Sequence, residues 1–571
     1  MFNIYKNFFN ILSPDWRRKS FVVLFLMLFG TFLETLGIGL VIPAITIMMD
    51  ADIVKNYPIF NSKLTYFDNA SHGTIILGGL SILLLFYFLK AIYLSVMVYF
   101  QAKFIYGIKE FISAKLFEKY LFVKYEYHLS SNSSKLIRNL TTEMIQLANY
   151  FLLPSIVLIT EITVMIAFSC LLFYFEPLGF LILIIFLSTI LFIYYIVMKN
   201  RLNAWGALRQ NHEGVRIQKA QEAFAGSKDV RVLGCEKYFE KTYRKHNTLA
   251  SVIERKQHFI AHLPKLWLEA IGVFGLVILA VFALDRTNNP IDVIPVIAMF
   301  AAAAFRILPA INRIITSLQS LRYSKVVTDL IVNEINNITV NISSNKDVVF
   351  EHKIELRNIT FSYANDIKPT LSNISLKINK GECIGLIGPS GSGKSTLIDI
   401  LLGLLVPNQG SILVDNLDIT NRLRGWQKMV GYVQQNVYIT DDTLRRNIAF
   451  GIEDDEIDKN RLSSAVSTAN LSNLVNESAN GLDTIIGEAG SRLSGGQKQR
   501  IGIARALYHN PPFLIFDEST SALDIQTESV IMKEIYKMKG ARTILIITHR
   551  LSTIESCDRV YEINNCSLKQ I

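Results

Sequence analysis

The chain has 571 residues, of which 50% are hydrophobic and 19% are charged, and its mean hydropathy is +0.31. This length exceeds one soluble domain of about 100–200 residues, and the positive hydropathy argues against a disordered chain and an ordinary cytosolic enzyme. The net charge of +10 could mark a nucleic-acid-binding protein. However, residues 1–346 hold about 34 Lys and Arg against 22 Asp and Glu, whereas residues 347–571 hold about 24 against 26, so the positive charge lies in the first part.

Six apolar runs occupy that first part, and only Glu34 interrupts the first of them. About 20 apolar residues form a helix of roughly 30 Å, which is enough to cross a bilayer. The first run is too long for the core of a signal peptide. We therefore predict an α-helical membrane domain of six transmembrane helices at residues 1–325. The runs lie at residues 21–49, 74–102, 147–175, 178–198, 266–284 and 291–318.

Basic residues flank these runs asymmetrically. Segments 103–143 and 199–257 are rich in Lys and Arg and contain no Pro, so we expect two long helical hairpins that extend beyond the bilayer. The loops on the other side are near neutral or slightly acidic, at residues 50–73, 175–177 and 285–292. The positive-inside rule places both termini and both basic segments in the cytoplasm.

The sequence pattern changes after the last apolar run. Residues 326–349 end in the Asn- and Ser-rich stretch NNITVNISSNKDVV and are interpreted as a linker. From residue 350, short β-rich runs alternate with helical segments, which predicts an α/β domain over residues 350–571. The expected strands are IELRNITFSY, LSNISLKI, ECIGLIG, SILVD, MVGYV, FLIFDE and TILIITH, and the expected helices are STLIDILLGLL and GGQKQRIGIARALYH.

The five cysteines are scattered and form no CxxC pair, which argues against a disulfide framework and against a zinc site. We interpret them as separate thiols in a reducing compartment. They are Cys170, Cys235, Cys383, Cys557 and Cys566.

Residues 388–395 read GPSGSGKS and match the phosphate-binding pattern GxxxxGK[ST], between an expected strand and an expected helix. Glycines let backbone N–H groups cradle phosphate oxygens, and the helix N-terminus adds partial positive charge. Lys394 should reach the β- and γ-phosphates of ATP, and Ser395 should bind Mg²⁺. The expected ATP contacts here are Gly388, Ser390, Gly391, Gly393, Lys394, Ser395 and Thr396.

The strand FLIFDE ends in two carboxylates. Asp517 is suited to the Mg²⁺ shell, and Glu518 is suited to polarising the attacking water. A strand-end Asp-Glu pair is often only a solvated turn, but here it follows a P-loop in the expected order.

At this point the chain resembles the ATP-binding cassette family. Residues 493–497 read LSGGQ, the signature of that family, and residues 484–490 are similar to its TxVGExG element. The resemblance implies that Tyr363 stacks on adenine, that Gln435 is the Q-loop glutamine and that His549 is the switch histidine, with Gln434 standing where a proline is common. Residues 521–524 are similar to the D-loop. The resemblance also implies that Gln435 is a Mg²⁺ ligand and that Gln435 and His549 are catalytic residues together with Glu518. The further ATP contacts that it implies are Ser494, Gly495, Gly496, Gln497 and Asp524.

The chain holds one P-loop and one LSGGQ, whereas one nucleotide site in this family needs both from two different copies. The resemblance therefore implies a half-transporter whose ATPase activity drives export, and intact motifs favour a homodimer over a heterodimer. The implied cofactors are ATP and Mg²⁺. The hairpin tips, placed near residues 125–134 and 223–234, should contact the ATP-binding domains.

Cations inside the apolar runs bear on the cargo, because charges at bilayer depth are costly and often line a polar pathway. Arg306 and Arg313 are seven residues apart and share about one helix face. Arg suits phosphate, whereas Lys90 and Lys265 could instead snorkel to the surface. Glu34, Glu161 and Glu269 could pair with some of these four cations.

The segments FLETLGIGLVIPAI, PKLWLEAIG and RILPAINRIITSLQSLRY resemble the bacterial lipid-linked oligosaccharide flippases of protein glycosylation. The resemblance implies a polyprenyl-pyrophosphate glycan as substrate, held by Lys90, Lys265, Arg306 and Arg313, in the bacterial inner membrane. No nucleic acid partner is expected, because most of the positive charge lies in the two basic segments, where it fixes the topology. Segment 51–73 could include an external amphipathic helix or be an ordinary loop. The alternative cargoes are lipid A core, a phospholipid, a peptide or a drug, and an ATP-gated channel is the alternative from another class.

Overall fold

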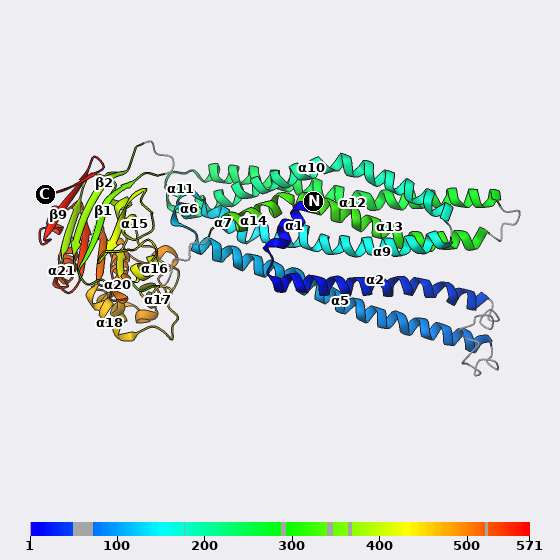
Figure 1. The fold of residues 1–571 in the computed structure, drawn as a ribbon, viewed down its shortest axis with the longest axis horizontal. Coiled ribbons are helices and arrows are strands. Elements are labelled where there is room, and N and C mark those ends of the chain that lie inside the picture. The colour runs from blue at the N-terminus through cyan, green and yellow to red at the C-terminus, as the bar shows by residue number, and fades with distance from the viewer. Residues whose placement is uncertain are drawn as a thin grey trace. The chain divides into compact units, whose positions relative to one another are not determined.

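A computed structural model describes residues 2–49, 72–175, 177–286, 293–339, 346–363, 368–519 and 524–571 of the chain. The chain divides into two compact units, and each is described by itself. The first unit comprises residues 1–123 and 130–340, and the second comprises residues 124–129 and 341–571. The first unit is helical, whereas the second is built around two sheets (Figure 1).

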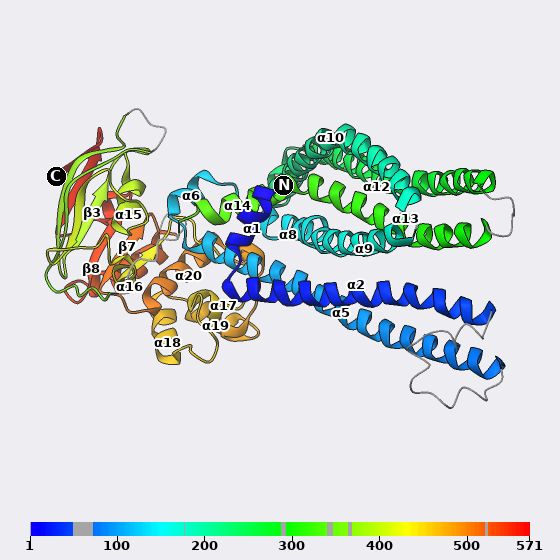
Figure 2. The same cartoon turned by 45° about the vertical axis from the view of Figure 1, so that its right-hand side comes forward.

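Six long helices form the body of the first unit, and each covers most or all of one predicted span, which confirms the helical membrane domain. Two of them, α2 and α5, run side by side as a pair (Figures 1 and 2), and α2 also packs against α9. Among the described residues, three segments are long and apolar enough to cross a membrane: Pro14–Gly37, Ile76–Phe122 and Ser133–Cys170. The six helices are α2 (Pro14–Met49), α5 (His72–Phe122), α9 (Leu153–Phe175), α10 (Pro177–Ala225), α12 (Glu236–Arg286) and α13 (Val293–Tyr323).

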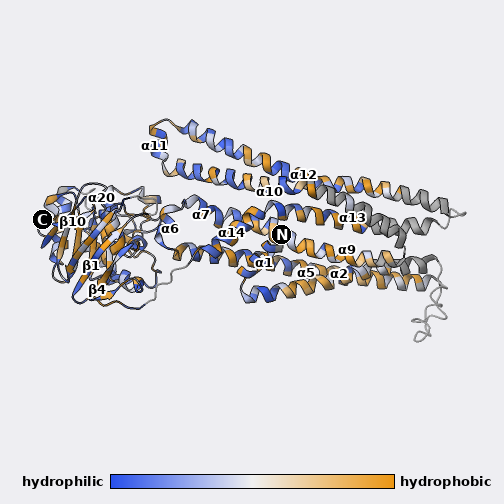
Figure 3. Ribbon diagram, turned by 45° about the horizontal axis from the view of Figure 1, so that its top comes forward, coloured by the Kyte–Doolittle hydropathy of each residue, from blue (hydrophilic) through white to orange (hydrophobic). Residues whose placement is uncertain are grey.

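Hydropathy changes along these helices. In Figure 3, hydrophobic residues gather on α2, α5 and α9, and hydrophilic residues gather on α11 and on the neighbouring turns of α10 and α12. Apolar runs form helices in a bilayer because no water is present to hydrogen-bond the backbone, and a helix pairs its own N–H and C=O groups. Shorter elements complete the unit: α1 (Phe2–Ile11), α7 (Ser133–Leu140), α8 (Thr142–Leu147), a π-helical turn (Ala148–Leu152), α11 (Ser227–Val232) and α14 (Lys325–Asn337).

One apolar cluster joins α9, α12 and α13. Ile307, Ile311 and Ile315 recur every four residues on α13, so they share one face and pack against Val164 and Phe168 of α9. The region 326–349, interpreted above as a linker, begins as the packed helix α14. Five α14 side chains are buried, so this part belongs to the first unit: Val327, Thr328, Ile331, Val332 and Ile335.

The second unit contains a four-stranded antiparallel sheet in the order β2-β1-β4-β5 and a six-stranded sheet in the order β10-β9-β3-β8-β7-β6. In the larger sheet only β10 is antiparallel to its neighbour. Ligand sites of such sheets lie at the carboxyl ends of the parallel strands, so the segments that follow β3, β6, β7 and β8 meet at one edge. The strands are β1 (Lys353–Phe361), β2 (Leu371–Asn379), β3 (Cys383–Ile387), β4 (Gln409–Val414), β5 (Leu417–Asp418), β6 (Val430–Val433), β7 (Phe513–Asp517), β8 (Thr543–Ile547), β9 (Arg559–Asn564) and β10 (Ser567–Gln570).

All seven predicted strands and both predicted helices of this unit are present, whereas β5, β9 and β10 were not predicted. Two apolar clusters fill the unit, one around the four-stranded sheet and α15 and the other around α18, α20 and α21. The helices are α6 (Tyr125–Ser130), α15 (Lys394–Leu401), α16 (Leu423–Lys428), α17 (Leu444–Ile448), α18 (Lys459–Thr468), α19 (Ser472–Glu477), α20 (Gly495–Tyr508) and α21 (Ile525–Lys537), with short 3-10 turns at Gly481–Asp483, Glu488–Gly490 and Leu551–Thr553.

Candidate functional site

The P-loop connects the end of β3 to the start of α15. Gly393 immediately precedes the helix with φ +101°, and a Cβ atom there would lie 2.8 Å from the side chain of Leu371, so only glycine fits. The Lys394 ammonium folds back and donates to the carbonyl oxygens of Gly388 at 2.8 Å and Pro389 at 3.0 Å. Burial lowers the pKa of Lys394. The loop therefore holds a cation against its own backbone.

Two hydroxyl groups of this loop fit a bound phosphate group, and a third contacts Tyr363. The Ser392 hydroxyl is buried and has no hydrogen-bond partner among the described residues, which is costly unless a polar ligand completes it. Ser395 is exposed in the first turn of α15, where the helix dipole favours an anion. The Thr396 hydroxyl lies 3.1 Å from the Tyr363 hydroxyl, so the predicted adenine-stacking ring stands beside the P-loop helix.

The two other predicted catalytic side chains converge on Glu518. Gln435 donates from Nε2 to Glu518 Oε2 at 2.6 Å, and His549 Nε2 lies 2.8 Å from Glu518 Oε1. The sheet order explains this convergence, because Gln435 follows β6 by two residues, His549 follows β8 by two residues, and both strands flank β7. His549 also lies 3.5 Å from Lys394 Nζ. The contact supports Gln435, rather than Gln434, as the Q-loop residue.

Asp517 ends β7 beside two residues that the sequence analysis missed. Tyr432 of β6 donates its hydroxyl to Asp517 Oδ2 at 3.1 Å, and burial raises the pKa of Asp517. Burial and the charge of Asp517 together raise the pKa of Asp399 to about 6. Asp399 lies four residues after Ser395 on α15, so the two residues share one face of the helix. This spacing is the sequence signal that could have identified Asp399 as part of the site. No local pattern marks Tyr432.

The signature residues begin α20. Ser494 and Gln497 cap this helix reciprocally, because the Ser494 oxygen accepts from the Gln497 backbone at 3.2 Å and the Gln497 oxygen accepts from the Ser494 backbone at 2.8 Å. The Ser494 hydroxyl proton stays available for donation, and Ser494 and Gly495 are exposed. In the described part of the chain, no hydrogen bond or ion pair joins residues 494–497 to the P-loop. Thus one chain does not bring these two predicted halves of the site together.

Asp524 caps α21 by accepting from the backbone of Thr527 at 2.9 Å. The other three residues of the predicted D-loop, 521–523, lie outside the described residues.

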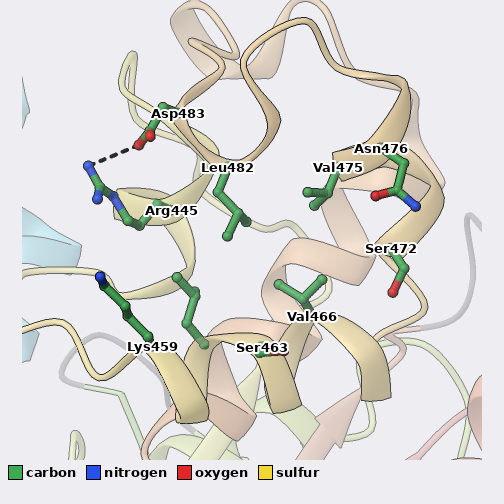
Figure 4. A pocket seen from close by; sticks show the side chains of 10 residues that line it. Arg445, Lys459, Ser463, Val466, Ser472, Val475, Asn476, Leu482 and Asp483 are labelled. Carbon is green, nitrogen blue, oxygen red and sulfur yellow. Dashed lines mark ion pairs between the residues drawn. The ribbon is translucent and has the colours of Figure 1, made fainter.

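Two pockets lie among the small helices of the second unit and hold none of the predicted nucleotide residues. One of about 380 Å³ lies between α17, α18 and α19, and the ion pair of Arg445 and Asp483, 2.9 Å long, stands at its side (Figure 4). The other, of about 600 Å³, adjoins Arg446 and Asp454.

Of the first predicted hairpin tip, residues 125–134, the part up to residue 129 groups with the second unit and the rest groups with the first. Tyr125 lies close enough to Asp399 for electrostatic interaction, and burial raises the pKa of Tyr125. The second predicted tip contains α11, which has no buried residue.

Three of the predicted substrate cations have partners in the first unit. Arg306 of α13 forms an ion pair with Glu34 of α2, and Lys90 of α5 lies close enough to both for electrostatic interaction. Lys90 also lies over the ring of Tyr87 at 4.9 Å. Two cations therefore share one carboxylate, and the cluster of Lys90, Glu34 and Arg306 carries one excess positive charge.

Arg313 has a carboxylate of its own. It donates from Nε to Glu161 Oε1 at 2.6 Å and from Nη2 to Glu161 Oε2 at 3.1 Å, which joins α13 to α9. Lys265 is exposed on α12, as is Glu269. Residues 51–71 of the predicted external segment 51–73 lie outside the described residues, and His72 and Gly73 begin α5.

Comparisons with known proteins agree with this architecture. Residues 21–307 match the ABC transporter transmembrane region, and residues 371–521 match the ABC transporter family. The ATP-dependent lipid A-core flippase of Burkholderia orbicola is 43% identical over 209 residues, 36% of this chain and 35% of that protein. The flippase of the same name from Saccharophagus degradans is 35% identical over 61% of this chain and 58% of that protein. The leukotoxin export ATP-binding protein of Aggregatibacter actinomycetemcomitans is 40% identical over 41% of this chain and 32% of that protein.

The chain thus spans about a third to three fifths of the length of these three relatives. A solved structure of a bacterial Atm1-family ABC exporter with ATP bound superposes with a TM-score of 0.79 over 98% of this chain and 96% of that chain. At 20% identity, that likeness shows the fold alone.

Proposed function

The chain belongs to the ABC transporter family, and from that premise we propose that it is one half of an ATP-driven exporter of a phosphate-bearing glycolipid. The finer proposal is a lipid-linked oligosaccharide, a polyprenyl-pyrophosphate glycan, moved from the cytoplasmic to the outer leaflet of a bacterial inner membrane. Both termini and the ATP-binding domain would lie in the cytoplasm. The short flippase-like segments and the membrane cations support this proposal.

The observation that carries the proposal is the cluster of Lys90, Glu34 and Arg306. A charge in the bilayer is costly unless it is paired, and among the described residues this cluster sets two cations against one carboxylate. An anionic head group would supply the second counter-charge, and the forked Arg guanidinium suits phosphate oxygens. Arg313 is balanced by Glu161 and contributes less to such a site.

Lipid A core is the second candidate, because two relatives are named lipid A-core flippases. Its phosphate groups present the same chemistry to Lys90 and Arg306. A third relative is named for leukotoxin export, so the peptide cargo considered in the sequence analysis is also tested.

The residues at the sheet edge account for the expected ATP hydrolysis. Mg²⁺ would be held by Ser395, Asp517 and Gln435, and it would neutralise charge on the β- and γ-phosphates. Lys394 would bind the phosphates, and Glu518 would orient and polarise the attacking water, while Gln435 and His549 hold the Glu518 carboxylate. The exposed signature at Ser494 would complete the site of a second copy.

A homodimer follows from the same division of the site. The second hairpin tip exposes three large apolar side chains, Phe224 at 81%, Val232 at 76% and Leu233 at 75%. Such clustered apolar exposure marks an interaction surface, and we assign it to the ATP-binding domain of the second copy. Native mass spectrometry of the detergent-purified protein should show twice 64.6 kDa, and Phe224→Glu should lower ATP hydrolysis without lowering nucleotide binding.

The cargo is tested in proteoliposomes with three fluorescent lipids: a polyprenyl-pyrophosphate oligosaccharide, lipid A core and a phospholipid. We expect ATP-dependent flipping of the first, no flipping by Glu518→Gln, and at least about tenfold slower flipping by Lys90→Gln and Arg306→Gln. The control is Arg244→Gln, an exposed residue on the cytoplasmic part of α12. Flipping of lipid A core alone would select the second candidate. ATPase stimulation by peptides without any glycolipid flipping would refute the proposal.

A further inference from the structure

Two cysteines that are 174 positions apart meet in the second unit. The sulfur atoms of Cys383 and Cys557 lie 3.2 Å apart. Cys383 is the fully buried first residue of β3, and Cys557 precedes β9 and is partly exposed. Their backbones are tied, because the Asp558 N–H donates to the Cys383 carbonyl at 2.8 Å and the Cys383 N–H donates to the Asp558 carboxylate at 2.9 Å. The thiols are therefore held in contact from both sides.

The two thiols have unequal surroundings. The hydrogen bond from Cys383, the Tyr536 hydroxyl 4.0 Å away and the Lys539 ammonium lower the pKa of Cys557, although burial opposes the shift. The hydrogen bond to Cys557 and burial raise the pKa of Cys383. A thiolate is the reactive form of cysteine, so the partly exposed Cys557 is placed to be the nucleophile and the buried Cys383 is placed to attack it afterwards.

We propose that Cys383 and Cys557 are a peroxide-sensitive dithiol that closes to a disulfide. The Cys557 thiolate attacks one oxygen of hydrogen peroxide, the O–O bond breaks, and the departing hydroxide takes up a proton as water. Cys383 sulfur then attacks the Cys557 sulfenic acid, loses its proton and expels a second water. Two thiols and one peroxide thus give one disulfide and two waters, and the sulfurs approach from 3.2 Å to about 2.05 Å.

The position of this pair gives the modification a structural consequence. β3 ends at Ile387, directly before the P-loop, and Cys557 follows the turn Leu551–Thr553 that comes after His549. Tyr536 bonds the carbonyl of Thr553 and lies beside Cys557. A disulfide would join β3, which leads into the P-loop, to the segment that follows His549 in the chain. The oxidised protein should therefore unfold at a higher temperature.

The test uses the full chain in detergent, treated with hydrogen peroxide, alkylated, digested and examined by mass spectrometry. We expect one cross-linked peptide pair, Cys383 to Cys557, that dithiothreitol removes. Cys383→Ala should instead accumulate a dimedone-reactive Cys557, and Cys557→Ala should show no cross-link. Cys566→Ala is the matched control from the same unit and should keep it. The inference is overturned if the wild-type chain gives no such pair while Cys566 is oxidised, or if Cys383→Ala leaves Cys557 unreactive to dimedone in folded protein.

Discussion

Removing the charge of Glu161 tests how α13 is held against α9. Its carboxylate accepts two hydrogen bonds from Arg313, at 2.6 Å and 3.1 Å, and its side chain is 9% exposed, whereas that of Arg313 is 40% exposed. The substitution Glu161→Gln keeps the shape but leaves the guanidinium without its counter-charge. Breaking a buried pair costs about 3–5 kcal/mol, and the exposure of Arg313 reduces this to about 2 kcal/mol.

The assay is thermal unfolding of the full chain in detergent at pH 7. A loss of about 2 kcal/mol corresponds to a fall of about 3 °C in Tm for a unit of this size. Arg313→Gln should cost a similar amount, because it leaves the carboxylate unpaired. The double variant should cost less than the sum of the two, with a coupling of about 1–2 kcal/mol. Glu269→Gln, an exposed carboxylate on α12, is the matched control and should stay within about 0.5 kcal/mol.

Two results would refute this reasoning. Additive single costs would show that the two side chains do not stabilise each other. A double variant that regains its Tm but loses glycolipid flipping would show that Arg313 contacts the cargo, as the sequence analysis expected, and is more than a link between two helices.

Three further predictions concern the second unit. His549→Ala removes the 2.8 Å contact with Glu518 and should lower the kcat of ATP hydrolysis by about 10²-fold, while nucleotide binding measured by fluorescence stays unchanged. Tyr432→Phe removes the hydrogen bond to Asp517 and should raise about tenfold the Mg²⁺ concentration needed for half-maximal ATPase activity; an unchanged requirement would contradict the assigned role. Burial alone would raise the pKa of Asp415, but three backbone N–H groups donate to its carboxylate and the net effect is a lowered pKa. The ionised form therefore stabilises the fold above pH ~4, and this stabilisation is lost as the pH falls. Asp415→Asn should therefore cost about 1 kcal/mol at pH 7 and almost nothing near pH 3 in thermal unfolding, and an equal cost at both would count against this.

Local patterns in the sequence predicted the elements of both units. An apolar run of 20 residues must be helical in a bilayer, so the six long helices followed from composition alone. The P-loop could also be predicted from the sequence, because its glycines and Lys394 lie within eight consecutive residues. The roles of Glu518 and His549 came from resemblance to a family, since neither residue type carries such a role by itself.

Long-range pairing decided the rest. The strand order, which no short window encodes, placed β6 and β8 beside β7 and so brought Gln435 and His549 onto Glu518. The same holds for the contact of Cys383 with Cys557, which the sequence alone presents as two scattered thiols.

By itself, then, the sequence determined where the helices, strands and phosphate loop lie, because those features depend on neighbours within about ten positions. Only the tertiary structure decided which charges meet. The cations of the membrane helices could be identified as costly from sequence, but Glu34 lies 272 positions from Arg306 and Glu161 lies 152 positions from Arg313. The packing of α13 against distant helices selects those partners, and it leaves the excess positive charge with Lys90 and Arg306.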